Sequence, residues 1–397
     1  MLTGKKILLG ITGGIAAYKT ANLASMLAKL HADVHVIMTR NAQQFISPVV
    51  FEALTGNKVI DDVFDRNSGY HVAHIAMAQE ADAVMIAPAS ANIIAKLANG
   101  IADDMLSTTM LAVTAPVMIV PAMNTRMYEH PATQANLEKL RTYGYRVIEP
   151  ASGYLACGDT GKGKMPREEE LLEYLLAEAA CVKDLSGKKV LITAGPTREP
   201  IDPVRFITNY STGKMGYALA KNAARRGAQV VLVTGPVHLP APVSVNVIPV
   251  TTAQEMYEAV DAQFDSQDIV VMSAAVADYR PKHTASEKIK KQDTAAMLEL
   301  ERTKDILGSM AKRKSRQFLC GFSMETEHML ENSRAKLEKK NLDMIVANNL
   351  RMEGAGFGTD TNIITIITKD EAQELPIMSK DEAAHAIFDQ IKNFVCG

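Results

Sequence analysis

Short runs rich in Val, Ile and Leu alternate with helical stretches along the whole chain, and this alternation constrains the fold more than any other feature. Parallel strands need a crossover before the next strand can pair, and a helix usually supplies it. We therefore expect parallel sheets with helices on both faces. The first strand is expected at 6–11, followed by a glycine loop and a helix that places Leu23, Met26, Leu27 and Leu30 on one face.

The alternation starts twice. The segment KKVLITAGPT at 188–197 has the same pattern as KKILLGITGG at 5–14, namely two lysines, a buried strand and a glycine turn. Any two strand-turn-helix units share this pattern, so it does not by itself indicate a duplication. The charged and mostly helical stretch 164–187 lies between the two starts. The sequence therefore predicts two doubly wound α/β domains, a flavodoxin-like or Rossmann-like domain in 1–185 and a Rossmann-like domain in 186–397.

Each half continues with further strands. In the first half they are expected at 34–38, 83–87, 117–120 and 145–149. In the second half a helix at about 214–226 should end at Gly227, and the last helix should begin at Ser379 with Glu382 completing a capping box. The strands of the second half are expected at 230–233, 245–250, 268–272, 318–322, 342–347 and 362–367.

Composition excludes several classes of protein. The net charge of −2 gives no general attraction to nucleic acid or to a membrane surface. The four cysteines are far apart and form no C-x-x-C pair, so we expect neither a zinc site nor a disulfide framework. No run approaches the ~20 apolar residues of a membrane span. We expect a cytoplasmic protein that binds small molecules.

The loops after the strands indicate which ligand the first half binds. In open α/β sheets the ligand lies outside the carboxyl ends of the strands. The first loop, GITGGIAAYK, is not G-x-G-x-x-G, and Thr39 stands where an acidic residue would hold the ribose of NAD. These features argue against a nicotinamide dinucleotide. They favour a mononucleotide whose phosphate rests on backbone N–H groups at a helix start.

Three polar residues lie in or beside these loops. His74 precedes a helix, Asn124 follows a buried strand, and Cys157 lies in the long glycine-rich loop 153–165. Each has a structural alternative, because a lone histidine is often structural, an asparagine in a turn is usually turn chemistry, and a lone cysteine is usually a small buried residue.

Read together, the motifs of the first half resemble one family. GGIAAYK, His74-Ile75, APASAN, PAMNTRM and ACGDTGKGKM occur in this order. They are similar to the flavoproteins that decarboxylate an N-acylated cysteine, above all phosphopantothenoylcysteine decarboxylase. The resemblance implies that FMN takes electrons from the substrate thiol, so that the neighbouring carboxyl group can leave.

The resemblance also assigns roles. It implies that His74 is the active-site base, that Asn124 with Met123 binds the substrate and its carboxylate, and that Cys157 donates a proton. It further implies a site shared between subunits, with trimers of the flavin domain and dimers of the ligase domain in a dodecamer. The flavin contacts that it implies are Gly13, Gly14, Ile15, Thr39, Ser90, Asn92, Met105 and Ser107.

The second half resembles phosphopantothenate–cysteine ligase. The resemblance rests on ITAGPTREPIDPVRFITNYSTGKMG at 192–216, SAAVADYRP at 273–281 and EKIKK at 287–291. Making an amide in water requires an activated carboxylate, and in this family CTP supplies an acyl-cytidylate with a divalent ion, here Mg²⁺. ATP in place of CTP is left open by the residues.

The resemblance implies that Asn209 acts in forming and holding the acyl-cytidylate. It implies that Lys288 contacts the triphosphate, and that Asp278 contacts the ribose or the metal. The segment SEKIKKQ is expected to close over the site. The remaining substrate contacts that we expect are Arg205, Ala274, Ala275, Phe322, Lys290 and Lys291.

Three other classes of protein fit the sequence less well. A Rossmann oxidoreductase with NAD(P) is disfavoured by the first loop and by Thr39. A flavin-binding regulator without enzymatic activity would not require His74, Cys157 and the complete second half together. A flavin prenyltransferase would not carry the Cys157 loop or a ligase domain. FMN released from a yellow purified protein would separate the first of these from the flavoprotein reading.

Overall fold

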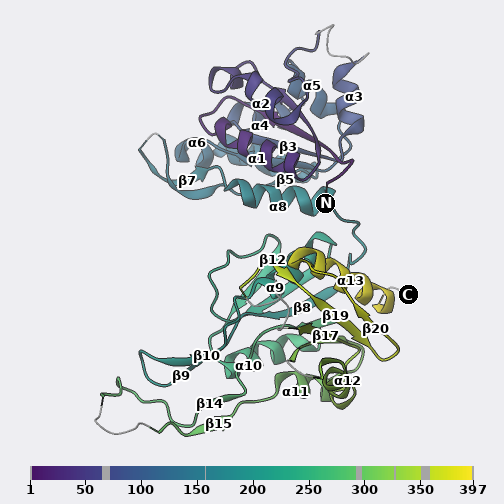
Figure 1. Cartoon of the computed structure of the whole chain (residues 1–397). Helices are drawn as coiled ribbons and strands as arrows, with labels where there is room; N and C mark the ends of the chain where they lie inside the picture. Colours follow the sequence, from purple (N-terminus) through teal and green to yellow (C-terminus); the bar gives the residue numbers. More distant parts are fainter. Residues whose placement is uncertain are drawn as a thin grey trace. The chain divides into compact units, whose positions relative to one another are not determined.

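The computed structural model of the chain describes residues 2–64, 72–156, 158–291, 297–325, 328–349 and 358–395. The chain divides into two compact units, Met1–Cys181 and Val182–Gly397, each with its own hydrophobic core. In both units helices cover the two faces of a sheet (Figure 1). Within the described residues, no helix combines the length and the apolar composition that crossing a lipid bilayer requires.

A parallel sheet forms the centre of the first unit. In spatial order its strands are β2 (Asp33–Met38), β1 (Lys6–Ile11), β3 (Ala83–Ala89), β4 (Val117–Pro121) and β5 (Arg146–Val147). Every neighbouring pair is parallel. The strand order reverses between β1 and β3, so the loops that leave these two strands diverge and create a crevice at the carboxyl edge of the sheet.

Alternating side chains of β1 build the two cores of this unit. Ile7, Leu9 and Ile11 pack on one face, and Leu8 packs on the other. The first face is covered by α1 (Ala17–Lys29), α2 (Pro48–Thr55) and α8 (Glu168–Ala179). The second face is covered by α3 (Ala73–Glu80), α4 (Ala91–Ala98), α5 (Met105–Ala112), α6 (Thr125–Glu129) and α7 (Pro131–Thr142).

A hairpin lies outside the main sheet of the first unit. Its strands β6 (Ala151–Tyr154) and β7 (Thr160–Lys164) are antiparallel. β7 contacts α6, which begins directly after Asn124. The hairpin therefore lies next to the loop that follows β4.

The second unit has a larger sheet of mixed direction. In spatial order its strands are β12 (Val245–Pro249), β11 (Gln229–Thr234), β8 (Lys189–Ala194), β13 (Ile269–Met272), β16 (Phe318–Glu325), β17 (Met344–Asn349), β19 (Ile364–Thr368) and β20 (Ala372–Glu374). The pairs from β12 to β17 are parallel, whereas β19 and β20 pair in antiparallel fashion. The order reverses between β8 and β13, which again leaves a crevice at the carboxyl edge.

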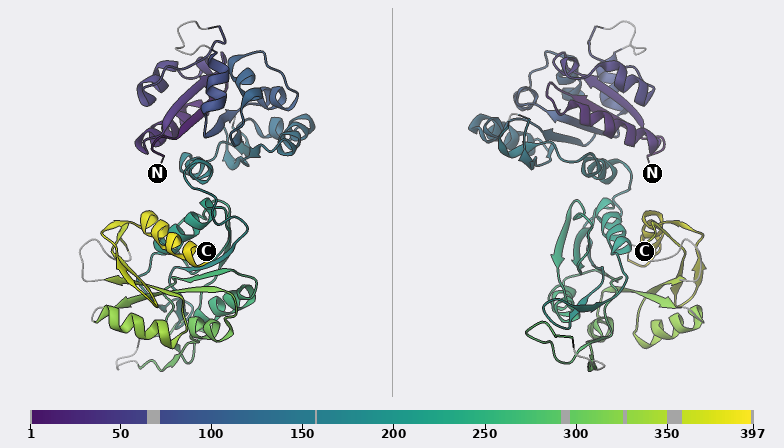
Figure 2. Two further views of the ribbon diagram at one scale, coloured as in Figure 1. Left: turned by 90° about the vertical axis from the view of Figure 1, so that its right-hand side faces the viewer. Right: turned by 60° about the vertical axis from the view of Figure 1, so that its left-hand side comes forward.

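Two sets of helices cover this sheet. α9 (Lys214–Arg225) and α13 (Lys380–Val395) pack on one face and contact each other. Figure 2 shows α13, in yellow, beside α9, in teal. The other face is covered by α10 (Ala253–Phe264), α11 (Ile306–Arg313) and α12 (Met329–Lys339).

Two small hairpins extend from the second sheet. One joins β9 (Arg198–Pro200) to β10 (Phe206–Thr208), and the other joins β14 (Tyr279–Pro281) to β15 (Leu300–Arg302). β9 and β14 are in contact, and Figure 1 shows both hairpins reaching away from the main sheet. A short pair of β18 (Thr361–Asn362) with β21 (Met378–Ser379) lies before α13.

The predicted fold class is confirmed, and so are two of its local signals. α9 ends before Gly227, whose φ of +90° is the left-handed conformation that glycine adopts readily. Ser379 and Glu382 bond to each other's backbone N–H groups, which is the capping box expected at the start of α13. The antiparallel direction of β19 was not expected, because a run of buried β-branched residues does not reveal its direction.

Candidate functional site

A cavity of about 530 Å³ lies at the carboxyl edge of the first sheet, where the strand order reverses. It is formed by the loops after β1, β3 and β4, together with the hairpin β6–β7. Of the predicted site residues it brings together Gly13, Gly14, Ile15, Ser90, Met123 and Asn124.

The glycine loop forms the wall next to α1. A Cβ atom on Gly13 would lie 2.7 Å from Cβ of Asn41, so a side chain at this position has no room. The N-cap residue of α1 is Ala16, which has no side-chain acceptor for the first-turn N–H groups. Two of these N–H groups, those of Ala17 and Lys19, donate to the carbonyl oxygens of Gly14 and Ala16 at 3.0 Å. The partial positive charge of the helix start still favours an anion at this wall.

Ser90 is fixed between two loops. Its backbone N–H donates to Oγ1 of Thr12 at 2.9 Å, and that hydroxyl donates to the carbonyl oxygen of Pro88 at 2.7 Å. The Ser90 hydroxyl caps α4 by accepting from the N–H of Ile93 at 3.4 Å. The loops after β1 and β3 are thus joined by hydrogen bonds at the cavity wall.

Asn124 is held at both ends of its amide. Its Oδ1 accepts from the N–H of Arg126 at 2.9 Å and caps α6. Its Nδ2 donates to Oδ2 of Asp159 at 2.7 Å. Asp159 lies in the turn of the hairpin β6–β7, so a carboxylate of the hairpin is bonded to the amide that was predicted to bind a substrate carboxylate.

Close backbone contacts seat the hairpin on this loop. A Cβ atom on Gly163 would lie 2.2 Å from the carbonyl oxygen of Met123, and the φ of Gly163 is +137°. The N–H of Met123 donates to the carbonyl oxygen of Gly163 at 3.0 Å. Glycine at 163 is therefore required for this approach. Cys157, the predicted proton donor, lies outside the described residues.

Five predicted residues of the first half that the structure describes do not line the cavity, and three of them lie in α3, in the loop after β2 and in α4. His74 is half-buried in the first turn of α3. Thr39 accepts a hydrogen bond from the N–H of Ala42 at 3.3 Å. Asn92 is exposed on α4. Within the described residues of one chain, the predicted base is thus separate from Asn124 and the glycine loop.

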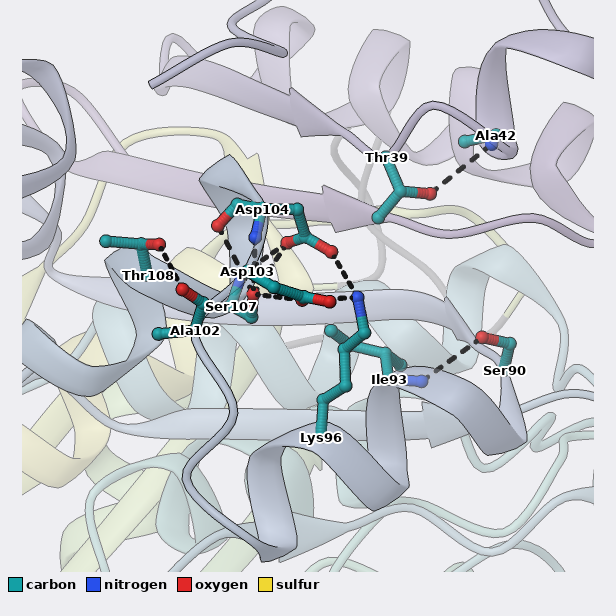
Figure 3. A network of polar contacts seen from close by, with 10 residues as sticks. All are labelled: Thr39, Ala42, Ser90, Ile93, Lys96, Ala102, Asp103, Asp104, Ser107 and Thr108. Carbon is teal, nitrogen blue, oxygen red and sulfur yellow. Dashed lines mark hydrogen bonds and ion pairs between the residues drawn. The ribbon is translucent and has the colours of Figure 1, made fainter. Parts of the chain in front are cut away.

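Ser107 and Met105 are both buried at the start of α5. The Ser107 hydroxyl bonds to Asp104 in a capping box, and Asp104 also bonds to Lys96 of α4 (Figure 3). Burial alone would raise the pKa of the Asp104 carboxyl, but the bonds from Lys96 and Ser107 outweigh burial and hold that pKa below its usual value. Neither Met105 nor Ser107 lines the cavity, and the geometry gives Ser107 a capping role.

The rim of this cavity carries large apolar side chains that face solvent. Ile15 is 61% exposed and Tyr154 is 71% exposed. Tyr18 and Met127 are also exposed, and all four line the cavity. A gathering of exposed apolar side chains around a cavity is typical of a surface that binds a ligand or another protein.

Two adjoining cavities lie at the carboxyl edge of the second sheet. The Thr303 cavity, of about 490 Å³, lies beside the segments 276–279 and 302–307. The Lys214 cavity, of about 370 Å³, lies at the start of α9. They share Ala274, Val276, Asp278 and Phe322 as lining residues.

Internal hydrogen bonds position the segment between these cavities. The N–H of Ala274 donates to Oγ1 of Thr193 at 3.1 Å, and the N–H of Ala275 donates to the carbonyl oxygen of Gly195 at 2.9 Å. Both N–H groups are therefore used inside the chain, and recognition of a base would depend on other groups. Asn209 donates from Nδ2 to the carbonyl oxygen of Ala275 at 2.9 Å, which places this side chain at the Lys214 cavity.

A clamp at Asp202 holds the predicted closing segment. Arg205 donates from Nε and Nη2 to Oδ2 of Asp202 at 3.0 and 2.5 Å. The N–H of Ile289 donates to the same oxygen at 3.2 Å, and Arg205 donates to the carbonyl oxygen of Ile289 at 2.9 Å. Hydrogen bonding from Arg205 holds the pKa of Asp202 well below its usual range.

The lysines of this segment lie outside both cavities. Lys288, Lys290 and Lys291 are exposed, and neither cavity is lined by them. Sequence reasoning missed the lysines that do line the cavities, which are Lys214, Lys304, Lys336, Lys340 and Lys380. Lys214 stood inside the motif STGKMG, but its neighbours in space come from distant parts of the sequence.

Asp278 is an exposed carboxylate at the boundary of the two cavities. Within the described ranges, no group of three or more His, Cys, Asp or Glu side chains could hold a metal by itself. Mg²⁺ is commonly bound by one or two carboxylates together with substrate phosphates. Asp278 fits that kind of site, in which the nucleotide brings the remaining ligands.

Comparisons with known proteins cover nearly the whole chain. The model of the Flavoprotein family matches residues 1–180, and that of the DNA/pantothenate metabolism flavoprotein C-terminal domain matches residues 185–395. The coenzyme A biosynthesis bifunctional protein CoaBC of Bacillus subtilis (strain 168) is 51% identical over 98% of this chain and 97% of its own length.

Among solved structures, the C-terminal domain of a coenzyme A biosynthesis bifunctional protein CoaBC is 46% identical, with a TM-score of 0.47 over 53% of this chain and 97% of that one. The FMN-dependent cysteine decarboxylase SpaF is 33% identical, with a TM-score of 0.40 over 46% of this chain and 100% of that one.

Proposed function

The chain belongs to the family of bifunctional coenzyme A biosynthesis proteins, and on that premise we propose which residues carry out its two reactions. Residues 186–397 join 4′-phosphopantothenate to cysteine through an acyl-cytidylate formed from CTP. Residues 1–185 decarboxylate the resulting 4′-phosphopantothenoylcysteine to 4′-phosphopantetheine with FMN.

One observation carries the assignment of the first half. A single cavity joins a glycine loop at a helix start to Asn124 and to the hairpin that contains the Cys157 loop. The glycine loop at a helix start is what the phosphate of a mononucleotide needs, and Asn124 is what the carboxylate of an acidic substrate needs. Their junction at the reversal of strand order is where an open α/β sheet binds its ligand.

The residues present fit FMN. The glycine loop has no Cβ at Gly13 or Gly14, and the partial positive charge at the start of α1 favours a phosphate there. The apolar wall with Ile15, Met123 and Met165 suits a planar ring system. When bound there, FMN supplies a two-electron acceptor for the substrate thiol. Ser90 and Ile15 would be contacts of the cofactor, whereas Thr39 and Asn92 lie outside the cavity that would hold it.

Asn124 orients the substrate carboxylate. Its amide is fixed in direction by Arg126 and Asp159, and it carries no charge that would hold the carboxylate back from leaving as CO₂. We assign proton transfer to His74, and proton donation to the reduced product to Cys157, which lies outside the described residues.

The location of His74 supports a site that is shared between copies of the chain. His74 lies apart from the cavity of its own chain, and the cavity rim is apolar and exposed. A second copy that covers the rim would bury this surface and supply the imidazole. We therefore propose trimers of the flavin domain, joined through dimers of the ligase domain into a dodecamer.

In the second half the Thr303 cavity would hold the nucleoside and the Lys214 cavity the phosphates. Asp278 and Phe322 line both cavities, so they lie where the ribose and the first phosphate would meet. Asn209 lies beside them and would hold the acyl-cytidylate for attack by the amine of cysteine. Mg²⁺ would be bound by Asp278 and phosphate oxygens.

The clamp at Asp202 gives the lysine segment a defined hinge. Arg205 and Ile289 are fixed there, while Lys288 extends into solvent. Closure of this segment over bound CTP would bring Lys288 to the phosphates and exclude water, with Lys290 and Lys291 adding positive charge.

The test is a complete assay of the two reactions with the full chain. With 4′-phosphopantothenate, cysteine, CTP and Mg²⁺, we expect phosphopantetheine, CO₂, CMP and pyrophosphate. ATP in place of CTP tests the nucleotide preference. Amide formation without CO₂ would refute the first half of the proposal, and CO₂ release from added phosphopantothenoylcysteine without amide formation would refute the second half. We place both reactions in the cytoplasm, where a thiol such as that of Cys320 stays reduced.

A further inference from the structure

The Lys214 cavity is lined by charged side chains from distant parts of the chain. Among the described residues that line this cavity, the positive charges are Lys214 of α9, Lys336 of α12 and Lys380 of α13, against the single carboxylate of Asp278. Lysines from three helices that converge on one cavity create a positive field, which an anion of several charges would neutralise.

Lys214 lies at the first position of α9. The N-cap residue of α9 is Gly213, which is in the left-handed conformation. Glycine has no side chain to accept a hydrogen bond from the first-turn N–H groups. The ammonium of Lys214 donates to Asp360 at 2.6 Å and to the carbonyl oxygen of Gly358 at 2.9 Å, and both partners are exposed to solvent. An ion pair with an exposed partner contributes little, so an arriving anion can share Lys214 at small cost.

Lys380 differs from the other two lysines because it is buried. Lysines are rarely buried, and this residue is only 7% exposed. Its ammonium donates to the carbonyl oxygen of Thr359. Burial, and then the nearby Lys214 ammonium, lower the pKa of Lys380. Burying a lysine next to a second lysine costs free energy. A bound anion would offset that cost.

The floor of the cavity also contains polar groups that are not satisfied. Asn348 is 7% exposed and Asn362 is 2% exposed, and Oδ1 of each is buried with no hydrogen-bond partner among the described residues. Buried polar atoms of this kind are rare, and two of them lie together in the lining of this cavity. These oxygens are acceptors, so the water shell of a hydrated anion would satisfy them.

We propose that Lys380, together with Lys214 and the start of α9, binds the two terminal phosphates of CTP and then the pyrophosphate that leaves. The inference rests on the proposed ligase function and adds residues that the sequence motifs did not indicate. Lys380 is close to the end of the chain, and the formation of β21 and α13 brings it under the phosphate site.

The chemical step places the leaving charge at this end of the cavity. A carboxylate oxygen of 4′-phosphopantothenate forms a bond to the α-phosphorus of CTP, and the bond from that phosphorus to the bridging oxygen breaks. The electron pair stays on the bridging oxygen, so pyrophosphate departs with the additional negative charge. The negative charge on the departing pyrophosphate grows during the step. Ammonium groups that bind its two phosphates therefore stabilise the transition state.

The test separates binding of the terminal phosphates from binding of the nucleoside. We measure the Kd of CTP, CMP and pyrophosphate with Mg²⁺ by calorimetry on the full chain, for the wild type and for Lys380→Met and Lys380→Arg. We expect Lys380→Met to raise the Kd of CTP and of pyrophosphate at least tenfold and to leave that of CMP within twofold. Lys380→Arg keeps the charge and should retain most of the affinity.

A second measurement needs no variant, so it holds even if Lys380→Met fails to fold. In the wild type, pyrophosphate should bind when CMP is saturating and should be excluded by CTP. Equal weakening of CTP and CMP by Lys380→Met, or competition between pyrophosphate and CMP, would overturn the proposal. If CTP does not support amide formation at all, the ligase function itself fails. If CTP does support amide formation, but Lys380→Met leaves the ratio of the Kd of CTP to the Kd of CMP unchanged, only the role of Lys380 fails.

Discussion

The two halves place their candidate sites at the same position of similar sheets, yet the sites differ in how complete they are within one chain. In the first half the cavity has an exposed apolar rim, and His74 lies outside it. In the second half the two cavities are lined by lysines and contain Asn209, Asp278 and Phe322 together.

The difference indicates how each half is completed. An apolar rim is unfavourable in water and is stabilised when another surface covers it, which is why we propose that a second copy completes the first site. A cavity lined by lysines needs no second protein surface to cover it, and in our proposal the ligand and the segment at 287–291 complete it.

The largest expected effect concerns His74. Replacing it in His74→Asn should lower the rate of decarboxylation by about 10² to 10⁴, the usual contribution of general acid–base catalysis. Amide formation should not change, because His74 belongs to the other unit. Release of CO₂ from phosphopantothenoylcysteine measures the first rate, and pyrophosphate release measures the second. Full decarboxylation by this variant would remove His74 from the mechanism.

The next effect concerns the clamp of the second half. Asp202→Asn removes the charge that holds Arg205 and Ile289, and misplacing a closing segment can cost up to about 10² in rate. We expect amide formation to fall roughly tenfold, with decarboxylation of added phosphopantothenoylcysteine unchanged. Val204→Ala, in the same turn and exposed, is the matched control. Unchanged amide formation in Asp202→Asn would show that the clamp does not serve the reaction.

The pH dependence of this clamp follows from its pKa. Because the pKa of Asp202 is lowered in the folded protein, its contribution is present above the usual pKa of 3.8 and is lost only as pH falls through the lower folded value. Amide formation should therefore show no inflection from this group between about pH 5 and 8. An acidic inflection that disappears in Asp202→Asn would contradict this assignment.

A smaller effect is expected at Asp159. Its bond to Asn124 is charge-assisted and contributes roughly 1.5 kcal/mol, so Asp159→Ala should lower kcat of decarboxylation about tenfold. Asp159→Asn keeps an acceptor oxygen and should recover most of the rate. Steady-state kinetics of CO₂ release measures both variants. If both lose the same activity, the orientation of Asn124 is not what Asp159 provides.

The smallest effects are on stability and compare one cap in each half. Ser107→Ala and Ser379→Ala each remove a capping hydroxyl and should lower the free energy of unfolding by about 1 kcal/mol. Urea unfolding followed by circular dichroism measures this change. Ser107→Ala should leave the affinity for FMN unchanged, as followed by flavin fluorescence. A large loss of FMN affinity would restore Ser107 as a flavin contact.

The elements of the fold were predictable because each has a local signal. The strands at 6–11, 34–38 and 83–87 are buried runs between turns, and the structure has β1, β2 and β3 there. The direction of β19 and the hairpins β9–β10 and β14–β15 were not predictable. Strand direction and pairing depend on contacts between distant segments, which a run of residues does not contain.

The same distinction holds for the residues of the candidate sites: those with a local sequence signal were predicted, and those placed by contacts between distant segments were not. Residues inside long motifs, such as Gly13, Asn124 and Asp278, line the cavities. Lys336 and Lys380 were missed, because single lysines on helices give no local signal for a site, and only the packing of α12 and α13 brings them to the Lys214 cavity.

The most direct test of the account is whether two defective chains restore each other. His74→Asn and Asn124→Ala chains are each purified alone and also co-expressed, and the CO₂ released from phosphopantothenoylcysteine is measured. If one copy supplies His74 to the cavity of another, random mixing should give intact residue pairs in about a quarter of the sites, with activity to match. Activity of the mixture no higher than the mean of the two single variants would contradict a site completed by a second copy.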